Sequence, residues 1–247
     1  MQWYLDPADG AGSYLISRNR FLVALHPEDL RRIEPHLEEV RLDSGAILVD
    51  ADEPITHAYF PHDAMVSLVS VMEDGSTAET ATIGREGLTG FGGLLDRDTA
   101  FNRHVVQVPG QAARIEFMKM RHAIQGSGNL RHVLSCYTQA LFAQTLQSVA
   151  CNGLHSLEAR CSRWLLMTHD RVGKDHFALT QEFLAEMLGV HRSTVTVTAQ
   201  MLQQRGAIRY RRGVVSILDR RELENTACEC YRTVRRAFER LLPLTFA

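Results

Sequence analysis

The sequence predicts an α+β fold in three parts: an N-terminal antiparallel barrel or sandwich, one long helix, and a C-terminal helix-turn-helix with a wing. Three observations carry this prediction. Short stretches rich in Val, Ile, Thr and Tyr alternate with turn residues between residues 39 and 116. Turn residues then vanish after Gly128, and further along the chain two short helical patterns meet at Gly189.

Composition describes a folded chain and excludes collagen, low-complexity and disordered classes, because 45% of its 247 residues are apolar and 23% are charged. The overall charge of -2 hides an uneven distribution. Residues 1–150 carry 12 basic and 19 acidic side chains, whereas residues 151–247 carry 15 and 10, so the second part is basic. Almost all basic residues are arginines, which suit phosphates and guanine edges, although genome base composition equally explains an arginine excess.

The N-terminal half predicts one short helix followed by a run of strands. Pro27 suits a first helical turn, and apolar residues at helical spacing extend the pattern to Leu37. Seven strands are predicted between turn signals, at residues 40–42, 47–49, 58–60, 65–72, 77–83, 104–108 and 113–117. Short strands at such close spacing favour a small antiparallel barrel or sandwich.

A helix of about 23 residues is predicted after Gly128, with one apolar stripe. The stripe consists of Leu130, Val133, Leu134, Tyr137, Leu141, Leu146 and Val149. Such a face covers the chain's own barrel, a partner helix, or both, and we favour a parallel two-helix seam in a homodimer. Asn152-Gly153 is expected to break or bend this helix before a second one over residues 156–169.

Residues 180–206 predict two helices joined by a turn. Thr180 is a good N-cap, Gly189 marks the turn, and Gly206 ends the second helix. In a helix-turn-helix the second helix enters the DNA major groove, so its outward side chains are candidates for reading bases. These candidates are Arg192, Ser193, Thr194, Thr196 and Gln200, with Val197 beside them. An ordinary helical hairpin with a polar face is the alternative.

A basic hairpin follows the second helix. Residues 207–218 form two short alternating stretches joined by Arg-Arg-Gly. Arg209, Arg211 and Arg212, together with Thr180, are the candidates for phosphate contacts, which fix the register of a protein on DNA without reading its sequence. A solvated edge is the alternative. Beyond the hairpin, residues 220–242 predict one amphipathic helix that packs on the DNA-binding domain or extends a dimer contact.

The pattern of cysteines and the lack of known catalytic motifs predict that the chain has no metal site, no cofactor and no enzymatic activity. The five cysteines are odd in number and contain no Cys-x-x-Cys pair, so neither a disulfide framework nor a zinc site is expected. Cys228 and Cys230 are interpreted as packed thiols on one helix. The chain lacks a Walker loop, a Gly-x-Ser-x-Gly elbow and a His-Glu-x-x-His motif. Without an N-terminal signal pattern or a membrane-length apolar stretch, a cytoplasmic location is expected.

These motifs resemble the Crp/Fnr family of bacterial transcription regulators over roughly residues 20 to 220. The match is strongest from Leu179 to Val195 and from Gln200 to Ile208. The resemblance implies a double-stranded β-helix (jelly-roll, cyclic-nucleotide-binding-like) domain over residues 1–126, a dimerisation helix over 127–152 and a winged helix-turn-helix over 153–247. It also implies a homodimer on a pseudo-palindromic DNA site, with RNA polymerase as a further partner.

The resemblance implies that Arg192, Ser193 and Thr196 read the DNA bases. Many members have Arg-Glu at the first two of these positions, whereas this chain has Arg192 and Ser193. We therefore do not assume that it prefers the same DNA half-site as the cyclic-AMP-binding members. The cyclic-nucleotide motif is degenerate, so we expect no cyclic AMP requirement. A small-molecule sensor whose ligand gates DNA binding is the alternative, with a candidate ligand loop of Gly90, Gly92, Asn102 and Arg103. The first cysteine is Cys136, and the histidines show no diagnostic spacing, which disfavours the iron-sulfur and haem sensors of the family.

Overall fold

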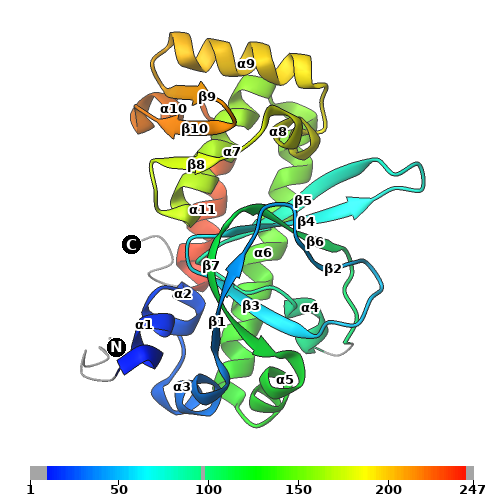
Figure 1. Cartoon of the computed structure of the whole chain (residues 1–247), viewed down its shortest axis with the longest axis vertical. Helices are drawn as coiled ribbons and strands as arrows, with labels where there is room; N and C mark the ends of the chain where they lie inside the picture. The colour runs from blue at the N-terminus through cyan, green and yellow to red at the C-terminus, as the bar shows by residue number, and fades with distance from the viewer. Residues whose placement is uncertain (1–9, 96–97, 243–247) are drawn as a thin grey trace.

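The computed structural model describes residues 10–95 and 98–242. A β-roll with short helices forms the lower half of the molecule in Figure 1, and a domain of helices with a small sheet forms the upper half. One long helix, α6 (Gly128–Leu154), runs behind both halves. This three-part arrangement confirms the predicted α+β fold class. No helix in the described ranges is long and apolar enough to cross a membrane.

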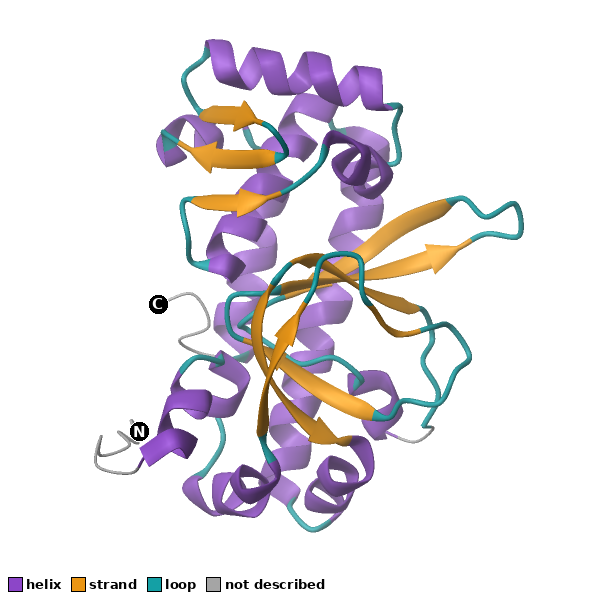
Figure 2. Ribbon diagram, in the orientation of Figure 1, coloured by secondary structure: helices purple, strands orange, loops and turns teal. Residues whose placement is uncertain are grey.

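The β-roll consists of two antiparallel sheets, coloured orange in Figure 2. One has the order β1-β7-β3 and the other the order β2-β6-β4-β5. All seven predicted strands are present: two have the predicted bounds, and the other five differ at one or both ends by one to three residues. They are β1 (Glu38–Leu42), β2 (Ile47–Val49), β3 (His57–Pro61), β4 (Met65–Val71), β5 (Thr77–Ile83), β6 (Arg103–Val108) and β7 (Gly110–Glu116).

Short helices close the β-roll, and most of them were not predicted. The predicted helix over residues 27–37 is in fact α3 (Pro27–Ile33) followed by a 3-10 turn (Glu34–His36). Pro35 lacks the N–H that an α-helix would need at that position, which explains the change. The additional helices are α1 (Gly10–Ser17), α2 (Arg20–Val23), α4 (Phe91–Leu95) and α5 (Phe117–Gln125).

The long helix α6 has two different faces along its length. In its first half Leu130, Leu134 and Tyr137 are buried in the core of the β-roll. In its second half Phe142, Leu146 and Val149 are 62%, 55% and 69% exposed. The predicted single stripe is therefore divided: the first half covers the chain's own β-roll and the second half presents apolar side chains to solvent. The helix runs through Asn152-Gly153, so the predicted break lies two residues later, at His155.

The upper domain begins with α7 (Leu157–Val172), capped by the hydroxyl of Ser156, which accepts from the backbone N–H of Ala159. It continues with the helices α8 (Gln181–Leu188) and α9 (Arg192–Gln204). Its sheet has the order β8-β10-β9, with β8 (His176–Ala178), β9 (Ile208–Arg211) and β10 (Val214–Ile217). The first strand of this sheet was not predicted.

The C-terminal segment corrects the prediction of one helix over residues 220–242. It forms α10 (Arg220–Thr226), which packs against α7, and α11 (Cys230–Leu241), which packs along α6. Buried Phe238 of α11 reaches the ring of Tyr137, with 6.5 Å between ring centroids. The final helix therefore joins the long helix of its own chain to the β-roll core.

A buried ion pair connects the two halves. Arg171 near the end of α7 and Glu86 in the loop after β5 are each 1% exposed, and Arg171 Nε donates to Glu86 Oε1 over 2.8 Å. Arg171 also donates from Nη2 to Gln144 Oε1 on α6 over 2.7 Å. One guanidinium group thus contacts the β-roll, the long helix and the upper domain.

A second contact between the halves involves the β4–β5 hairpin. Trp164 Nε1 of α7 donates to Glu79 Oε1 of β5 over 3.1 Å, and Ser67 donates to the other oxygen of that carboxyl over 2.7 Å. Burial at this contact raises the pKa of Glu79 to about 7. At the end of the hairpin, the Thr77 hydroxyl donates to Glu186 of α8.

Candidate nucleic-acid interface

The turn between α8 and α9 has the geometry that the sequence predicted. The hydroxyl of Thr180 accepts from the backbone N–H of Phe183 over 3.1 Å and begins α8. Gly189 ends it with φ 64° and ψ 42°, the left-handed region, and a Cβ built there would meet no atom within 4 Å. The backbone angle, not crowding, is therefore the reason for glycine at this turn.

The helix α9 lies at the top of the molecule in Figure 1, at the end farthest from the β-roll. Its inner side chains are buried against the domain: Val195, Thr198, Ala199 and Leu202. Opposite them, one exposed row runs along the helix at three- and four-residue spacing: Ser193, Val197, Gln200 and Gln204. This exposed row of α9 is free to enter a groove, whereas the buried side chains hold the helix in its domain.

The predicted base-reading residues are divided between this row and its edges. Ser193 and Gln200 belong to the row. Arg192 lies at one edge, where its guanidinium pairs with the carboxylate of Glu182, and Thr196 beside it donates to Gln181 Oε1 over 2.7 Å. Exposed Thr194 lies at the opposite edge. Gln204 was not predicted, although its position one helical turn after Gln200 signalled it.

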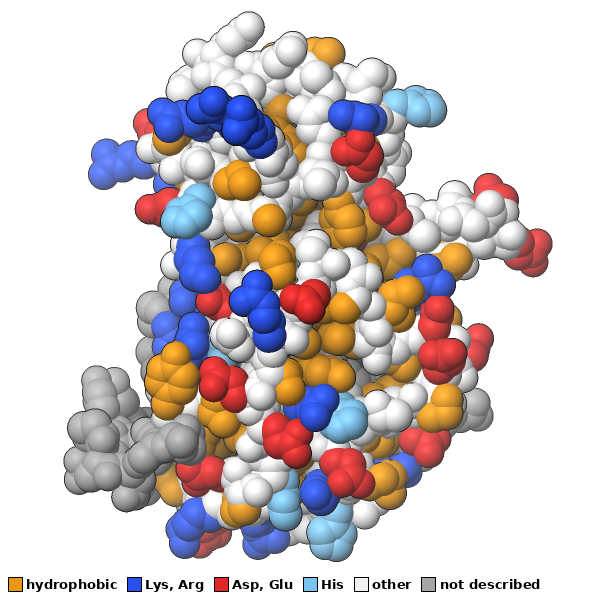
Figure 3. Space-filling model, viewed as in Figure 1, with side chains coloured by type: hydrophobic (Ala, Val, Ile, Leu, Met, Phe, Trp, Pro, Cys, Tyr) orange, Lys and Arg blue, Asp and Glu red, His pale blue; other side chains and the backbone are white. Residues whose placement is uncertain are grey.

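The hairpin of β9 and β10 forms a tight wing. Arg211 pairs with Val214, so the turn consists of Arg212 and Gly213, with φ 51° and 73°. Two central residues with positive φ match the twist of the flanking strands. Arg209, Arg211 and Arg212 are all exposed, and Figure 3 shows basic side chains gathered over this hairpin.

Two hydrogen bonds fix the wing to the helix-turn-helix. The backbone N–H of Tyr210 donates to Gln203 Oε1 of α9 over 2.9 Å, and its hydroxyl donates to the carbonyl of Leu179, just before α8, over 2.7 Å. Burial raises the pKa of Tyr210, so its phenol stays a neutral donor. The exposed row of α9, the start of α8 and the wing are therefore held in one fixed arrangement.

The candidate ligand loop is largely occupied by the chain's own contacts. Arg103 Nε and Nη2 bind both carboxylate oxygens of Asp50, over 3.1 and 2.7 Å. The side-chain amide of Asn102 donates to Thr80 over 3.4 Å. Gly90 has φ 75°, and a Cβ on Gly92 would come within 2.5 Å of the Phe101 ring. A ligand anion at this loop would compete with Asp50 for the charge of Arg103.

Comparison by sequence identifies the upper domain. Residues 159–226 match the Crp-like helix-turn-helix domain family. This range contains α7 except for its first two residues, all of α8 to α10, and with them the whole of the surface described above. No protein with curated annotation matches the sequence.

Solved structures extend the likeness to the full architecture. FixK2 from Bradyrhizobium japonicum aligns with a TM-score of 0.66 and 15% identity over 78% of this chain and 98% of that chain. A CRP-family transcriptional regulator from Thermus thermophilus aligns at 0.63 and 18% over 76% and 96%. The c-di-GMP responsive global regulator CLP of Xanthomonas campestris aligns at 0.60 and 16% over 78% and 100%. The chain therefore has the fold of these regulators, and residues 159–226 form a Crp-like helix-turn-helix domain.

Proposed function

We propose that this chain is a transcription regulator that binds a pseudo-palindromic DNA site as a homodimer, reads its sequence with α9, and does so without cyclic AMP. The observation that carries the proposal is the exposed row of α9, flanked by the arginines of the wing. The row offers chemistry for base edges: a glutamine can bond bidentately to adenine, and a valine can contact the thymine methyl group. The wing arginines supply phosphate contacts. Binding, not catalysis, is the role that this surface supports.

Dimerisation rests on the exposed second half of α6. Phe142, Leu146 and Val149 recur at helical spacing, and a second copy of the same helix is the occupant that the fold supports. Two copies place two wings and two α9 helices on one duplex. Leu146→Glu should therefore give monomers in sedimentation velocity and lose DNA affinity. Dimers that survive this substitution would exclude this face as the contact.

The absence of a cyclic AMP requirement rests on the Asp50–Arg103 pair. Its bidentate geometry occupies the cation that a cyclic phosphate would need. We therefore expect that added cyclic AMP leaves the affinity for the selected DNA unchanged. An increase in affinity would favour the alternative, a ligand-gated sensor.

The test of sequence reading starts with selection of binding sites from random DNA by the full-length protein. We expect a palindrome whose half-sites are about one helical turn apart. Gln200→Ala should then weaken binding to the selected site by about 10- to 100-fold and relax the preference at one base position, because a bidentate base contact is worth about 1–3 kcal/mol. Gln125→Ala, at an exposed glutamine of α5, is the matched control. Failure to enrich any palindrome would refute the proposal.

A further inference from the structure

Four possible metal ligands from distant parts of the sequence meet where α6 ends and α11 begins. Cys151 lies in the last turn of α6 and His155 directly follows that helix, whereas Cys228 lies two residues before α11 and Cys230 begins it. Cys151 Sγ lies 3.5 Å from Cys228 Sγ, and Cys230 Sγ lies 3.6 Å from His155 Nδ1. All four ligand atoms lie within 4.8 Å of one another. The three thiols are buried, and the His155 side chain is 22% exposed.

These separations can be compared with the edges of a tetrahedron around one zinc ion. Zinc bonds of about 2.3 Å to sulfur and about 2.0–2.1 Å to nitrogen place two sulfurs about 3.8 Å apart, and a sulfur and a nitrogen about 3.6 Å apart. The pairs Cys151–Cys228 and Cys230–His155 agree with these edges within 0.3 Å, and every other pair lies within 4.8 Å. Three cysteines and one histidine are a ligand set of structural zinc sites.

The surroundings support the ligands as they would around a metal. His155 directs Nδ1 into the cluster and holds Glu229 Oε1 with Nε2 over 3.3 Å, so a carboxylate fixes the ring from behind. Gln147 Nε2 donates to Cys230 Sγ over 3.0 Å. The guanidinium groups of Arg160 and Arg163 act electrostatically on Cys151. They would balance the negative charge left when three thiolates bind one Zn²⁺.

Other interpretations of the cluster explain less of it. Packed thiols need neither a histidine directed at sulfur nor a carboxylate behind that histidine, and a disulfide between Cys151 and Cys228 would use only two of the four groups. An iron-sulfur cluster distributes its cysteines over more than one iron. Elsewhere on α6, Cys136 Sγ lies 3.6 Å from His132 Nε2, and no third ligand group joins them within residues 10–95 and 98–242, so this pair offers an internal comparison.

We propose that Cys151, His155, Cys228 and Cys230 bind one Zn²⁺ ion, which fastens the C-terminal helix to the end of α6. On binding, the three thiols release their protons to solvent and each sulfur forms a bond to the metal. The site lies directly before Ser156, where the chain leaves the long helix for the DNA-binding domain. The expectation of packed thiols placed Cys228 and Cys230 on different sides of one helix. In the structure Cys228 precedes α11, and it meets Cys151, which is 77 positions away in the sequence.

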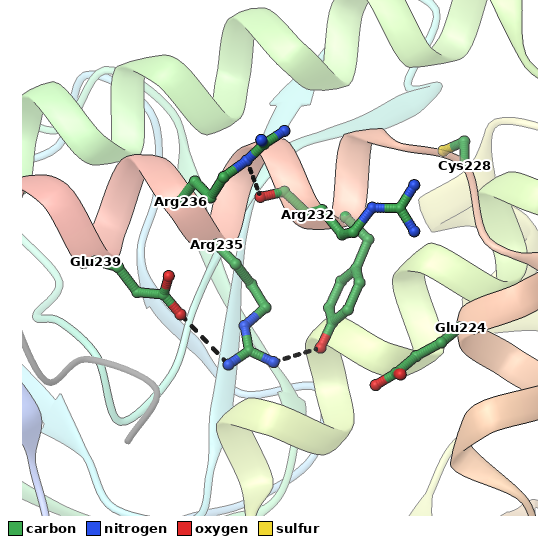
Figure 4. Close-up of a pocket in the computed structure, with 7 residues that line it drawn as sticks. Glu224, Cys228, Arg232, Arg235, Arg236 and Glu239 are labelled. Carbon is green, nitrogen blue, oxygen red and sulfur yellow. Dashed lines mark hydrogen bonds and ion pairs between the residues drawn. The ribbon is translucent and has the colours of Figure 1, made fainter.

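An entry route is present on the solvent side. Cys228 borders a pocket of about 330 Å³ formed by α10 and α11. Figure 4 shows Cys228 at one end of this pocket, with Arg232, Arg235 and Arg236 of α11 along it. We therefore expect ions and chelators to approach Cys228 from the side of this pocket.

The first measurement is the metal content of the full-length protein, purified with a thiol reductant and without chelator. We expect about one zinc per chain by elemental mass spectrometry. Replacement by Co²⁺ should give the strong visible absorption of tetrahedral cobalt with sulfur-to-metal charge transfer. Three results would overturn the proposal. They are a wild-type protein that binds neither zinc nor cobalt, a protein that contains iron and acid-labile sulfide in place of zinc, and a Cys151–Cys228 disulfide in the freshly reduced protein.

Variants then locate the site. Cys230→Ser should abolish the cobalt spectrum, whereas Cys136→Ser, which removes a thiol beside another histidine of α6, should keep it unchanged. Glu229→Gln should weaken zinc binding by about 10-fold in competition with a chelator, since the groups behind a ligand histidine tune its affinity. A circular dichroism spectrum checks that each variant is folded. Equal cobalt spectra for Cys230→Ser and the wild type would place the metal elsewhere.

Discussion

The buried pair of Arg171 and Glu86 allows a sharp stability test. We expect that Arg171→Met lowers the free energy of unfolding by about 3–5 kcal/mol, because removal of one partner leaves the other charge buried without compensation. This is a large share of the roughly 5–15 kcal/mol that keeps a typical protein folded. Both side chains are 1% exposed, so water cannot replace the lost guanidinium without opening the contact between the halves.

The contacts of Arg171 give the magnitude. Without it, the one donor left to the Glu86 carboxylate in the described part of the chain is the backbone N–H of Gly84, at 3.2 and 3.1 Å from Oε1 and Oε2. Gln144 Oε1 also loses its donor at 2.7 Å, and an unpaired buried acceptor adds about 1 kcal/mol or more. The Met side chain fills part of the space but bonds to neither oxygen. The loss should therefore lie toward the upper part of the expected range.

Urea unfolding followed by circular dichroism, at one fixed protein concentration, measures the effect. Arg41→Met is the control, since Arg41 and its partner Asp43 are 69% and 81% exposed, and such a pair contributes less than about 1 kcal/mol. The double variant Arg171→Met, Glu86→Leu should recover most of the loss, because apolar replacement of a whole buried pair is often neutral. The reasoning fails if Arg171→Met costs no more than Arg41→Met, or if the double variant loses the sum of both single losses.

Three further predictions concern the DNA-binding surface and its contact with the β-roll. Arg211→Ala should weaken binding to selected and scrambled DNA alike and reduce the slope of log affinity against log salt by about 1 in fluorescence anisotropy; a sequence-dependent loss would contradict a phosphate contact. Gly189→Ala should lower the free energy of unfolding by about 1 kcal/mol, and Gly189→Asn should lower it by less, because asparagine tolerates the left-handed backbone angle. Equal losses for the two variants would show that the backbone angle is not the reason for glycine here. The raised pKa of Glu79, about 7 against an ordinary 4.5, means that the folded state holds its proton more tightly, so stability should fall as pH rises from about 4.5 through 7. Glu79→Gln should remove this pH-dependent loss of stability, which is at most about 3 kcal/mol. Thermal unfolding measures the stability at each pH, and equal pH profiles for the variant and the wild type would refute the prediction.

The helix-turn-helix could be predicted because its signals are local. Thr180, Gly189 and Gly206 act on the backbone within a few residues of themselves, through a side-chain cap and left-handed angles. The strands of the β-roll were predicted for the same reason, since β-branched stretches between turns need no knowledge of their partners. Proline also acts locally, and the missing N–H of Pro35 was the signal that the helix after Pro27 must end early.

The division of the long helix could not be predicted, because it depends on what packs beside each turn. Leu134 and Leu146 have the same side chain on the same helix, yet one is buried and the other 55% exposed. The outward row of α9 was predicted only in part for a related reason. The spacing of apolar residues predicts which side of α9 faces outward only to within about one residue. It does not predict that Arg192 lies at the edge of that side, where it pairs with Glu182 of the neighbouring helix α8.

The order of the three parts, the seven strands, and the two helices with their turn and wing could all be predicted from the residues, because backbone propensity and periodicity act between near neighbours. Contacts between side chains far apart in the sequence became known only from the folded chain. Folding brought Arg171 to Glu86 and Cys151 to Cys228, which are 85 and 77 positions apart. No spacing rule connects such residues, since their distance is set by the packing of α7 on the β-roll and of α11 on α6.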